Sequence, residues 1–428
     1  MRKGLPEQSN RIRREVRVVK QYVIIGNGTA AIGTIEGIRS VDTTANITVI
    51  SKEKHPCYCR PLISYYMEEK TDPVRMLYRS ESFYADNGAE VLYGEEAVKI
   101  DPSAKKVVLA SGSIVPYDAL CIAAGSSPFV PPMENLDKVE KKFSFMTLDD
   151  AEDLIKALTP DTRLLIIGAG LIGLKCAEGA HHITDKITVC DLAGHVLSSI
   201  LEKEDAEVVQ AHLEENGVKF LLSDSVASFD GNCAVMKSGA KVEFDVLVTA
   251  VGVRANIQLM KDAGGACGRA ITVSDRMETS LEGIYAAGDC TEYNDISDES
   301  VKVMALMPNA YIGGKTAGIN MAGGEAAFDN AIPMNSIGFF GYHIMTAGSR
   351  NGEIKKTEDG KNRKKFFIRD GKLVGFMILG DVKNTGILTS LIRNRIPLDS
   401  LVDFDLEKTP AISAFDSENR SKFLESVV

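Results

Sequence analysis

The stretch Leu164-Leu-Ile-Ile-Gly-Ala-Gly-Leu-Ile-Gly173 joins an apolar, strand-like run to three glycines at a fixed spacing. A helical pattern follows to about His181, and a second apolar run, Ile187–Cys190, ends at Asp191. The first glycine of such a stretch permits a tight turn, the second lets the main chain approach a ligand, and the third lets helix and strand pack closely. The stretch therefore predicts a strand–turn–helix–strand unit that holds phosphates at the start of its helix.

An earlier segment repeats this order. Tyr22-Val-Ile-Ile25 leads into Gly26-Asn-Gly28-Thr-Ala-Ala31, then a helical pattern to Arg39 and an apolar run, Ile47–Ile50, beside Glu53. An acid at the end of the second strand can hold a ribose hydroxyl. Two copies of one arrangement predict two dinucleotide-binding domains of the Rossmann kind, which gives an α/β fold. The expected binding residues are Gly26, Gly28, Ala31 and Glu53 in the first copy and Gly168, Gly170, Gly173 and Asp191 in the second.

Asp191 also indicates which nicotinamide cofactor is used. A carboxylate at this position favours a free 2′-hydroxyl and repels a 2′-phosphate, so NADH should be preferred over NADPH. The residues that follow, Leu192-Ala-Gly194, offer no arginine for a 2′-phosphate.

Composition excludes several other classes. The 428 residues exceed one typical core, so two or three domains are expected. A pI near 5.3 argues against general nucleic-acid binding, and the longest apolar run, 164–174, is too short for a membrane span. The scattered histidines and the lack of paired CxxC motifs argue against a metal site. Without an export signal, the eight cysteines are expected to be thiols of a cytoplasmic protein.

Further motifs carry a resemblance to a known family. Tyr117–Pro128 includes Gly125, Phe244–Arg254 includes Gly252, and Thr279-Ser-Leu-Glu-Gly-Ile-Tyr-Ala-Ala-Gly-Asp289 looks like a second flavin fingerprint. Together with the two glycine motifs they resemble the pyridine nucleotide–disulfide oxidoreductase superfamily over residues 20–428. Tyr58-Cys-Arg-Pro-Leu-Ile-Ser64 is similar to a segment of NADH:rubredoxin reductases and of the flavin domain of nitrite reductases.

The resemblance implies FAD at the first copy and NADH at the second, with the NAD domain inserted into the FAD domain. It implies that Arg60, Gly125 and Asp289 bind FAD, that Gly252 borders the NAD site, and that the helix containing Asn309 points its N-terminus at the flavin. The expected division is a basic extension at 1–19, FAD-binding parts at 20–150 and 270–330, an NAD-binding domain at 151–269, and a C-terminal α/β interface or cap domain at 331–428.

The cysteines depart from the family pattern. Disulfide reductases of the superfamily carry CxxxxC beside the flavin, and this sequence has none. Cys57 and Cys59 stand nearby, where a thiolate close to Arg60 could be redox-active. A bridge across one intervening residue is strained, which favours simple packing.

A second departure concerns charge beside the flavin. Many relatives place a lysine after the Arg-Pro-x-x-Ser segment and pair it with a glutamate two residues beyond the last glycine of the NAD motif. The corresponding residues here are Tyr65 and Lys175. We hypothesise that Lys175 supplies the cation near flavin N5; the alternative is a solvent-facing helix lysine.

With no internal disulfide, electrons should pass between NADH and an external protein through FAD, the partner being rubredoxin, a ferredoxin or an iron–sulfur subunit. Nine basic residues between Arg350 and Lys372 could steer an acidic carrier, or form a solvated surface. Two alternatives are a thiol-dependent NADH oxidase or peroxide or disulfide reductase using Cys57 or Cys59, and a flavin-binding structural subunit with little turnover. A homo-oligomer or a larger complex is compatible with the sequence.

Overall fold

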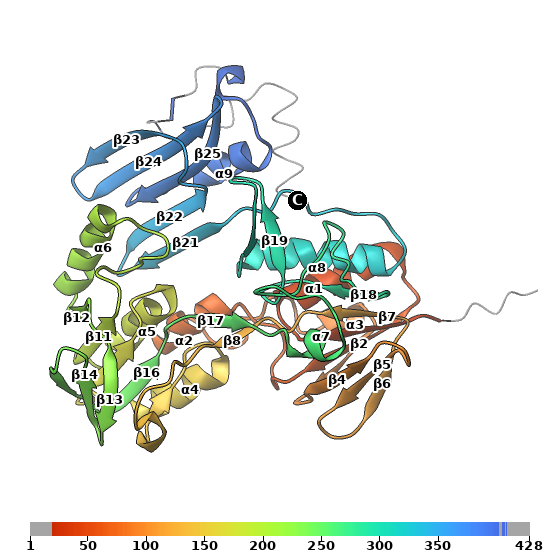
Figure 1. Cartoon of the computed structure of the whole chain (residues 1–428), viewed down its shortest axis with the longest axis horizontal. Coiled ribbons are helices and arrows are strands. Elements are labelled where there is room, and N and C mark those ends of the chain that lie inside the picture. The colour runs from red at the N-terminus through yellow and green to blue at the C-terminus, as the bar shows by residue number, and fades with distance from the viewer. Residues whose placement is uncertain (1–18, 402–404, 407, 409–428) are drawn as a thin grey trace, which may run out of the picture.

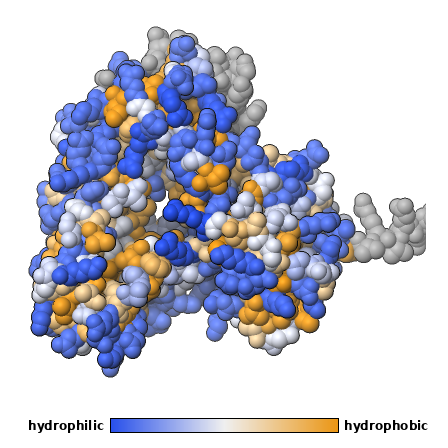
Figure 2. All heavy atoms as spheres, in the orientation of Figure 1, coloured by the Kyte–Doolittle hydropathy of each residue, from blue (hydrophilic) through white to orange (hydrophobic). Residues whose placement is uncertain are grey.

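A computed structural model describes residues 19–401, 405–406 and 408 and shows three units around a central hollow (Figures 1 and 2). The predicted basic extension, apart from Val19, and the end of the C-terminal unit lie outside the described residues. No described helix is both long and apolar enough to cross a membrane.

The first unit contains a parallel sheet in the order β18-β7-β1-β2-β3. Its strands are β1 (Gln21–Ile25), β2 (Asn46–Ser51), β3 (Ala89–Tyr93), β7 (Ala119–Ile122) and β18 (Ile284–Ala286). Strand β18 follows the whole second unit in the chain but pairs with β7. The second unit is therefore inserted into the first, as the sequence predicts.

The second unit repeats this plan in the order β12-β11-β10-β16-β9. Its strands are β9 (Lys142–Phe143), β10 (Leu164–Ile167), β11 (Ile187–Asp191), β12 (Lys219–Leu222) and β16 (Val246–Thr249). All its pairings are parallel, and the buried β10 lies between β11 and β16. Strand β9 comes from within the 20–150 segment and still joins this sheet.

The third unit is an antiparallel sheet in the order β21-β22-β25-β24-β23 with one helix against it. Its elements are β21 (Met334–Phe339), β22 (Tyr342–Gly348), β23 (Glu353–Asp359), β24 (Asn362–Arg369), β25 (Lys372–Leu379) and α9 (Thr385–Arg393). From the sequence alone, strands are expected at Ser336–Phe340, Lys365–Arg369 and Leu373–Leu379 and a helix at Gly386–Arg393. These correspond to β21, β24, β25 and α9, whereas β22 and β23 are not expected. Phe339 and Phe367 share a buried cluster with the second unit, whereas Phe366 packs with α9.

Shorter elements complete the units. One antiparallel three-stranded sheet contains β4 (Ala97–Asp101), β5 (Lys106–Leu109) and β6 (Ile114–Pro116). A second contains β13 (Val226–Asp230), β14 (Cys233–Met236) and β15 (Lys241–Glu243). Strands β8 (Ser126–Pro128) and β17 (Val253–Ala255) pair where the chain crosses between units, and β19 (Glu292–Asp295) pairs with β20 (Ser300–Val303). The remaining α-helices are α1 (Thr29–Val41), α2 (Ile63–Met67), α3 (Phe83–Asp86), α4 (Leu148–Ala157), α5 (Leu171–His181), α6 (Lys203–Glu215), α7 (Gln258–Asp262) and α8 (Met307–Met321).

Helices α1 and α8 lie in unusually close contact. A Cβ atom on Gly314 would stand 2.0 Å from the carbonyl oxygen of Ala30, and one on Gly33 would stand 2.3 Å from that of Tyr311. Glycine at these crossing points lets the two backbones touch. This contact sets α8 against the helix that begins at the first glycine loop.

Candidate functional site

The two glycine loops have the same geometry. Gly26 and Gly168 adopt φ values of +106° and +116°, and a Cβ on either would collide with a carbonyl oxygen of the neighbouring strand's end. By contrast, a Cβ on Gly28 or Gly170 would meet nothing within 4 Å. These two glycines cap α1 and α5 without a side-chain hydrogen bond, and the open space beside them leaves room for a ligand at each helix start. The geometry fits a dinucleotide pyrophosphate at each loop.

The third small residue of each motif behaves as expected. A Cβ on Gly173 would lie 2.0 Å from the Gly168 carbonyl oxygen, so only glycine allows α5 this close to its loop. Ala31 is fully buried at the start of α1.

The acid after each second strand is already hydrogen-bonded. Asp191 accepts bonds from the main-chain N–H of Ala169 at 2.7 Å and of Ala193 at 2.8 Å, so it braces the second glycine loop. Glu53 pairs with the Arg60 guanidinium and accepts a hydrogen bond from the Tyr58 hydroxyl at 2.8 Å. The structure thus brings Glu53 and Arg60 together beside the first loop, and Tyr58 joins them.

Asp289 stands at the end of β18, across from the first glycine loop. The Ser126 hydroxyl donates a hydrogen bond to its carboxylate at 3.4 Å, and burial raises the pKa of Asp289 while the charge of Arg60 opposes that rise. Gly125, just before Ser126, has a φ of +63° and open space where a Cβ would be. Gly252 has a φ of +111° and similar open space.

The N-terminus of α8 carries Pro308 in its first turn and no side-chain cap. The Asn309 side chain is fully buried, donates to the Ile332 carbonyl at 3.1 Å and accepts from Arg393 at 3.4 Å. This amide therefore braces the start of the third unit. Its main-chain N–H remains the part of Asn309 that could meet a cofactor at the helix start.

Lys175 is not a solvent-facing lysine. Its side chain is only 13% exposed, and its ammonium lies 4.5 Å from the centre of the Tyr65 ring. It forms an ion pair with Glu178 and donates to the Gly338 carbonyl at 3.3 Å. The proposed place of Lys175 at flavin N5 stays a prediction. The sequence reasoning missed Glu178, although the i,i+3 spacing on one helix was a usable signal.

One of the two candidate thiols lies at the start of α8. Cys59 Sγ lies 4.0 Å from Met307 Sδ, whereas Cys57 is buried. Burial raises the pKa of Cys57 to about 12 and also raises that of Cys59. All eight cysteines are free. The environment stabilises neutral thiols rather than the reactive thiolates of a redox pair.

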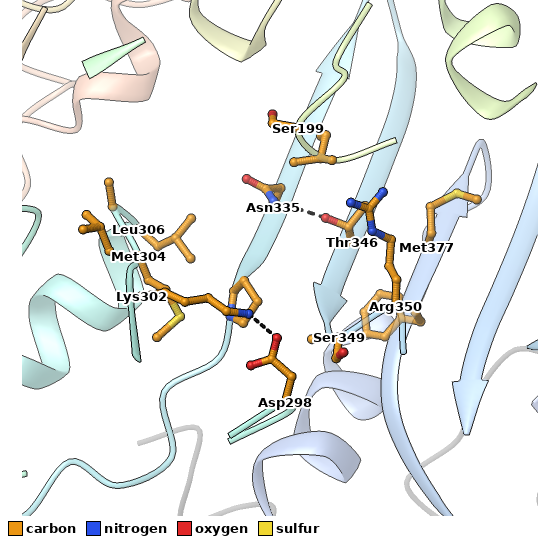
Figure 3. Close-up of a pocket in the computed structure, with 16 residues that line it drawn as sticks. Ser199, Asp298, Lys302, Met304, Leu306, Asn335, Thr346, Ser349, Arg350 and Met377 are labelled. Carbon is orange, nitrogen blue, oxygen red and sulfur yellow. Dashed lines mark hydrogen bonds and ion pairs between the residues drawn. The ribbon is translucent and has the colours of Figure 1, made fainter. Parts of the chain in front are cut away.

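A cavity of about 400 Å³ opens where the three units meet. It is bordered by Ser199 of the second unit, by the segment from Lys302 to Leu306 that leads into α8, and by Asn335, Thr346 and Arg350 of the third unit (Figure 3). Lys302 forms an ion pair with Asp298 at this wall, and Asn335 donates to Thr346 at 3.2 Å. The cavity reaches Leu306, the N-cap residue of α8.

Several cations of the basic segment from Arg350 to Lys372 form ion pairs with carboxylates of the second unit. Lys365, only 5% exposed, contacts the carboxylates of Glu202, Glu204 and Asp205 at the start of α6. Arg363 also reaches Asp205, at 3.5 Å, and Lys361 contacts Glu215, at 2.6 Å. The expected steering surface therefore loses three of its nine cations to a contact between the second and third units.

Comparison with known proteins decides the family. The model for pyridine nucleotide-disulphide oxidoreductases matches residues 20–314, and the model for the C-terminal domain of rubredoxin NAD⁺ reductase matches residues 333–396. The chain belongs to the pyridine nucleotide-disulphide oxidoreductase family. Members of this family are flavin-dependent NAD(P)H oxidoreductases that bind FAD and NAD(H), and the two glycine loops, Glu53–Arg60, Asp191 and Asp289 supply fitting places for those cofactors.

Several family members resemble the chain along its length. The NADH-dependent phenylglyoxylate dehydrogenase subunit epsilon of Aromatoleum evansii is 30% identical over 89% of this chain and 93% of its own. The NADH-rubredoxin oxidoreductase of Clostridium acetobutylicum is 25% identical over 90% of this chain and 97% of its own. A nitrite reductase of Bacillus subtilis is 30% identical over 92% of this chain, which spans about half of that larger protein. Among solved structures, an NAD-dependent persulfide reductase from A. fulgidus has a TM-score of 0.82 at 26% identity, covering 95% of this chain and 83% of its own.

Proposed function

We propose that this family member transfers electrons between NADH and an iron–sulfur protein, either a small carrier or a partner subunit of a larger oxidoreductase. The observation that carries the proposal is that two glycine loops shaped for dinucleotides occur together with cysteines that lack the CxxxxC spacing of a flavin-linked disulfide. FAD held at the first glycine loop would supply hydride acceptance and one-electron release, so electrons from NADH would need an acceptor outside the chain.

The relatives support a protein acceptor. One full-length relative is a rubredoxin oxidoreductase, and another is a subunit of an NADH-dependent dehydrogenase. The match of residues 333–396 to the C-terminal domain of rubredoxin reductases extends this likeness to the third unit. We place the protein in the cytoplasm, where its eight free thiols would stay reduced.

The chain's own residues have separate tasks in this relay. In this proposal the loop at Gly170 and the carboxylate of Asp191 would orient NADH, and Arg60, Asp289 and the start of α8 would bind FAD. Lys175 would place positive charge where the two cofactors meet, which favours electron-rich flavin. The cavity beside Leu306 opens toward the start of α8 from the side of the third unit.

The test is an anaerobic titration with NADH, followed through the flavin spectrum, and then addition of one acceptor at a time. The acceptors are rubredoxin, ferredoxin, hydrogen peroxide, a disulfide and oxygen. Fast reoxidation by an iron–sulfur protein and slow reoxidation by the others are expected. Slow reoxidation by every acceptor would instead support a structural flavoprotein.

A thiol-dependent reductase remains the second candidate because Cys59 is only partly buried and lies beside Met307 at the start of α8. The same titration separates it from the first. Fast reoxidation by peroxide or a disulfide that is lost in Cys59→Ser would establish this chemistry and reject the carrier.

A further inference from the structure

A largely buried cation stands at the start of α8. Arg393, the last residue of α9 in the third unit, donates from Nη2 to Asn309 Oδ1 at 3.4 Å and to Met334 Sδ at 3.9 Å. Its Nε is buried and has no hydrogen-bond partner. A guanidinium has five N–H donors and keeps its charge in proteins. These two long contacts therefore leave most of its bonding capacity unused.

No acid compensates the charge of Arg393. Within the described part of the chain it forms no ion pair with a carboxylate, and burial lowers its pKa without an opposing acid. By contrast, Lys302, the cation in the segment that leads into α8, pairs with both Asp295 and Asp298. A buried charge without a partner destabilises the fold, so Arg393 is an unfavourable residue for packing alone.

The direction of the guanidinium makes its position less favourable still. The start of a helix carries partial positive charge, which repels a cation, and the first turn of α8 contains no acidic residue. A cation is favourable at the end of its own helix, here α9. The Nη2 contacts of Arg393, however, are with Asn309 and Met334 of other elements. Positive charge is therefore gathered at the start of α8, where an anion would balance it.

Reduced flavin is such an anion. Hydride transfer from NADH adds two electrons and one proton to FAD and releases NAD⁺, so the flavin gains one negative charge. The proposed function puts the flavin at the start of α8, and the inference rests on that placement. A buried cation there stabilises the electron-rich flavin more than the oxidised flavin.

We propose that Arg393 tunes the flavin, because its unpaired charge at the start of α8 raises the reduction potential of the bound FAD. It is a positioning residue, since it contacts Asn309 and Met334 and acts on the cofactor across the start of that helix. Arg393 belongs to the third unit, whereas the first glycine loop belongs to the first. The third unit thus contributes to the driving force of electron transfer.

The midpoint potential of the bound FAD tests the proposal, in a spectroscopic redox titration of the full-length protein with reference dyes. Arg393→Met keeps the apolar stem and removes the charge. It should disfavour reduced relative to oxidised flavin about tenfold, a shift of about 30 mV to more negative potential for a two-electron couple. Arg393→Lys keeps the charge and should stay near the unaltered protein. Arg395→Met, at an exposed position two residues further on, removes the same net charge and is the matched control.

Thermal unfolding provides a second readout that requires no turnover. Arg393→Met should not destabilise the oxidised, FAD-loaded protein, because it removes a buried charge that has no partner. Reduction by dithionite should stabilise the unaltered protein more than it stabilises this variant, because the cation favours the reduced flavin.

Three outcomes would overturn the proposal. They are an unchanged potential in Arg393→Met, an equal shift in Arg393→Lys, and an equal shift in Arg395→Met. A loss of stability in oxidised Arg393→Met with an unchanged potential would assign the arginine to packing alone. No acceptor protein takes part in either measurement, so these outcomes do not depend on whether the proposed iron–sulfur partner is correct.

Discussion

The Lys175 ammonium lies 4.5 Å from the centre of the Tyr65 ring, and this contact joins the second unit to the first. Glu178 forms an ion pair with the lysine and accepts a hydrogen bond from the Phe340 N–H of the third unit at 2.7 Å. All three units are therefore in contact at the Lys175–Glu178 ion pair. The two residues at which the sequence differs from the lysine–glutamate pair that the resemblance implies contact each other, so a cation–aromatic contact stands where the resemblance leads us to expect an ion pair.

Replacing Lys175 should slow reduction by NADH. We expect Lys175→Met to lower the flavin reduction rate about tenfold and to make the flavin potential more negative, because a cation near the flavin stabilises its electron-rich form. Stopped-flow spectroscopy and a redox titration measure both effects. Lys175→Met/Glu178→Gln is the control for the buried carboxylate that the single change leaves unpaired. An unchanged rate and potential would show that Lys175 acts only in packing.

Asp191 should set the choice of nicotinamide cofactor. We expect kcat/KM to be at least about tenfold higher with NADH than with NADPH, since the carboxylate repels a 2′-phosphate. In Asp191→Ala that preference should shrink, and activity with NADH should also fall because Ala169 and Ala193 lose their acceptor. Equal efficiency with both cofactors in the unaltered protein would refute the assignment.

Lys365 should stabilise the contact between the second and third units. Lys365→Met leaves Asp205, which is 1% exposed, with only the more distant Arg363 guanidinium at 3.5 Å, and we expect a loss of about 3 kcal/mol in the free energy of unfolding. Lys361→Met breaks a largely exposed pair and should cost less than about 1 kcal/mol. Denaturant titrations of both variants give the comparison, and equal losses would contradict the structure.

The close contact of α1 and α8 should be sensitive to a single methyl group. Gly314→Ala brings Cβ against the Ala30 carbonyl, so we expect a loss of about 1–3 kcal/mol and weaker retention of FAD. Gly386→Ala, where a Cβ meets nothing within 4 Å, is the matched control and should be nearly neutral. Thermal unfolding and flavin release after gel filtration measure the two effects.

The thiols of Cys57 and Cys59 should react slowly with alkylating reagents. With a pKa near 12, Cys57 holds very little thiolate at pH 8. Burial also raises the pKa of Cys59, so its thiolate fraction is reduced as well. Alkylation should therefore be slow at pH 8 and accelerate as pH rises toward the pKa of Cys57. Turnover with an artificial acceptor should not change after the accessible thiols are blocked. Rapid labelling of Cys59 together with loss of turnover would favour the thiol-dependent alternative.

The parts of this protein that short stretches of sequence determine are its two nucleotide-binding units. Strand, glycine turn, helix and acid follow one another within about thirty residues, and the steric needs of each turn appear directly as Gly26, Gly28, Gly168 and Gly170. The extent of α5 and α8 follows in the same way, since Pro308 and the apolar pattern mark one helix start and the glycine motif marks the other. These features depend on local conformation, which neighbouring residues control.

Contacts between distant segments were decided only by the tertiary structure. Lys175 meets Gly338 across 163 positions of the chain, and Lys365 meets Asp205 across 160. The sequence does not distinguish an exposed lysine of a basic run from a lysine buried among carboxylates, because only the element that packs against each lysine makes them differ. The reciprocal glycines of α1 and α8 carry the same lesson, since Gly314 is needed only because the Ala30 backbone lies against it.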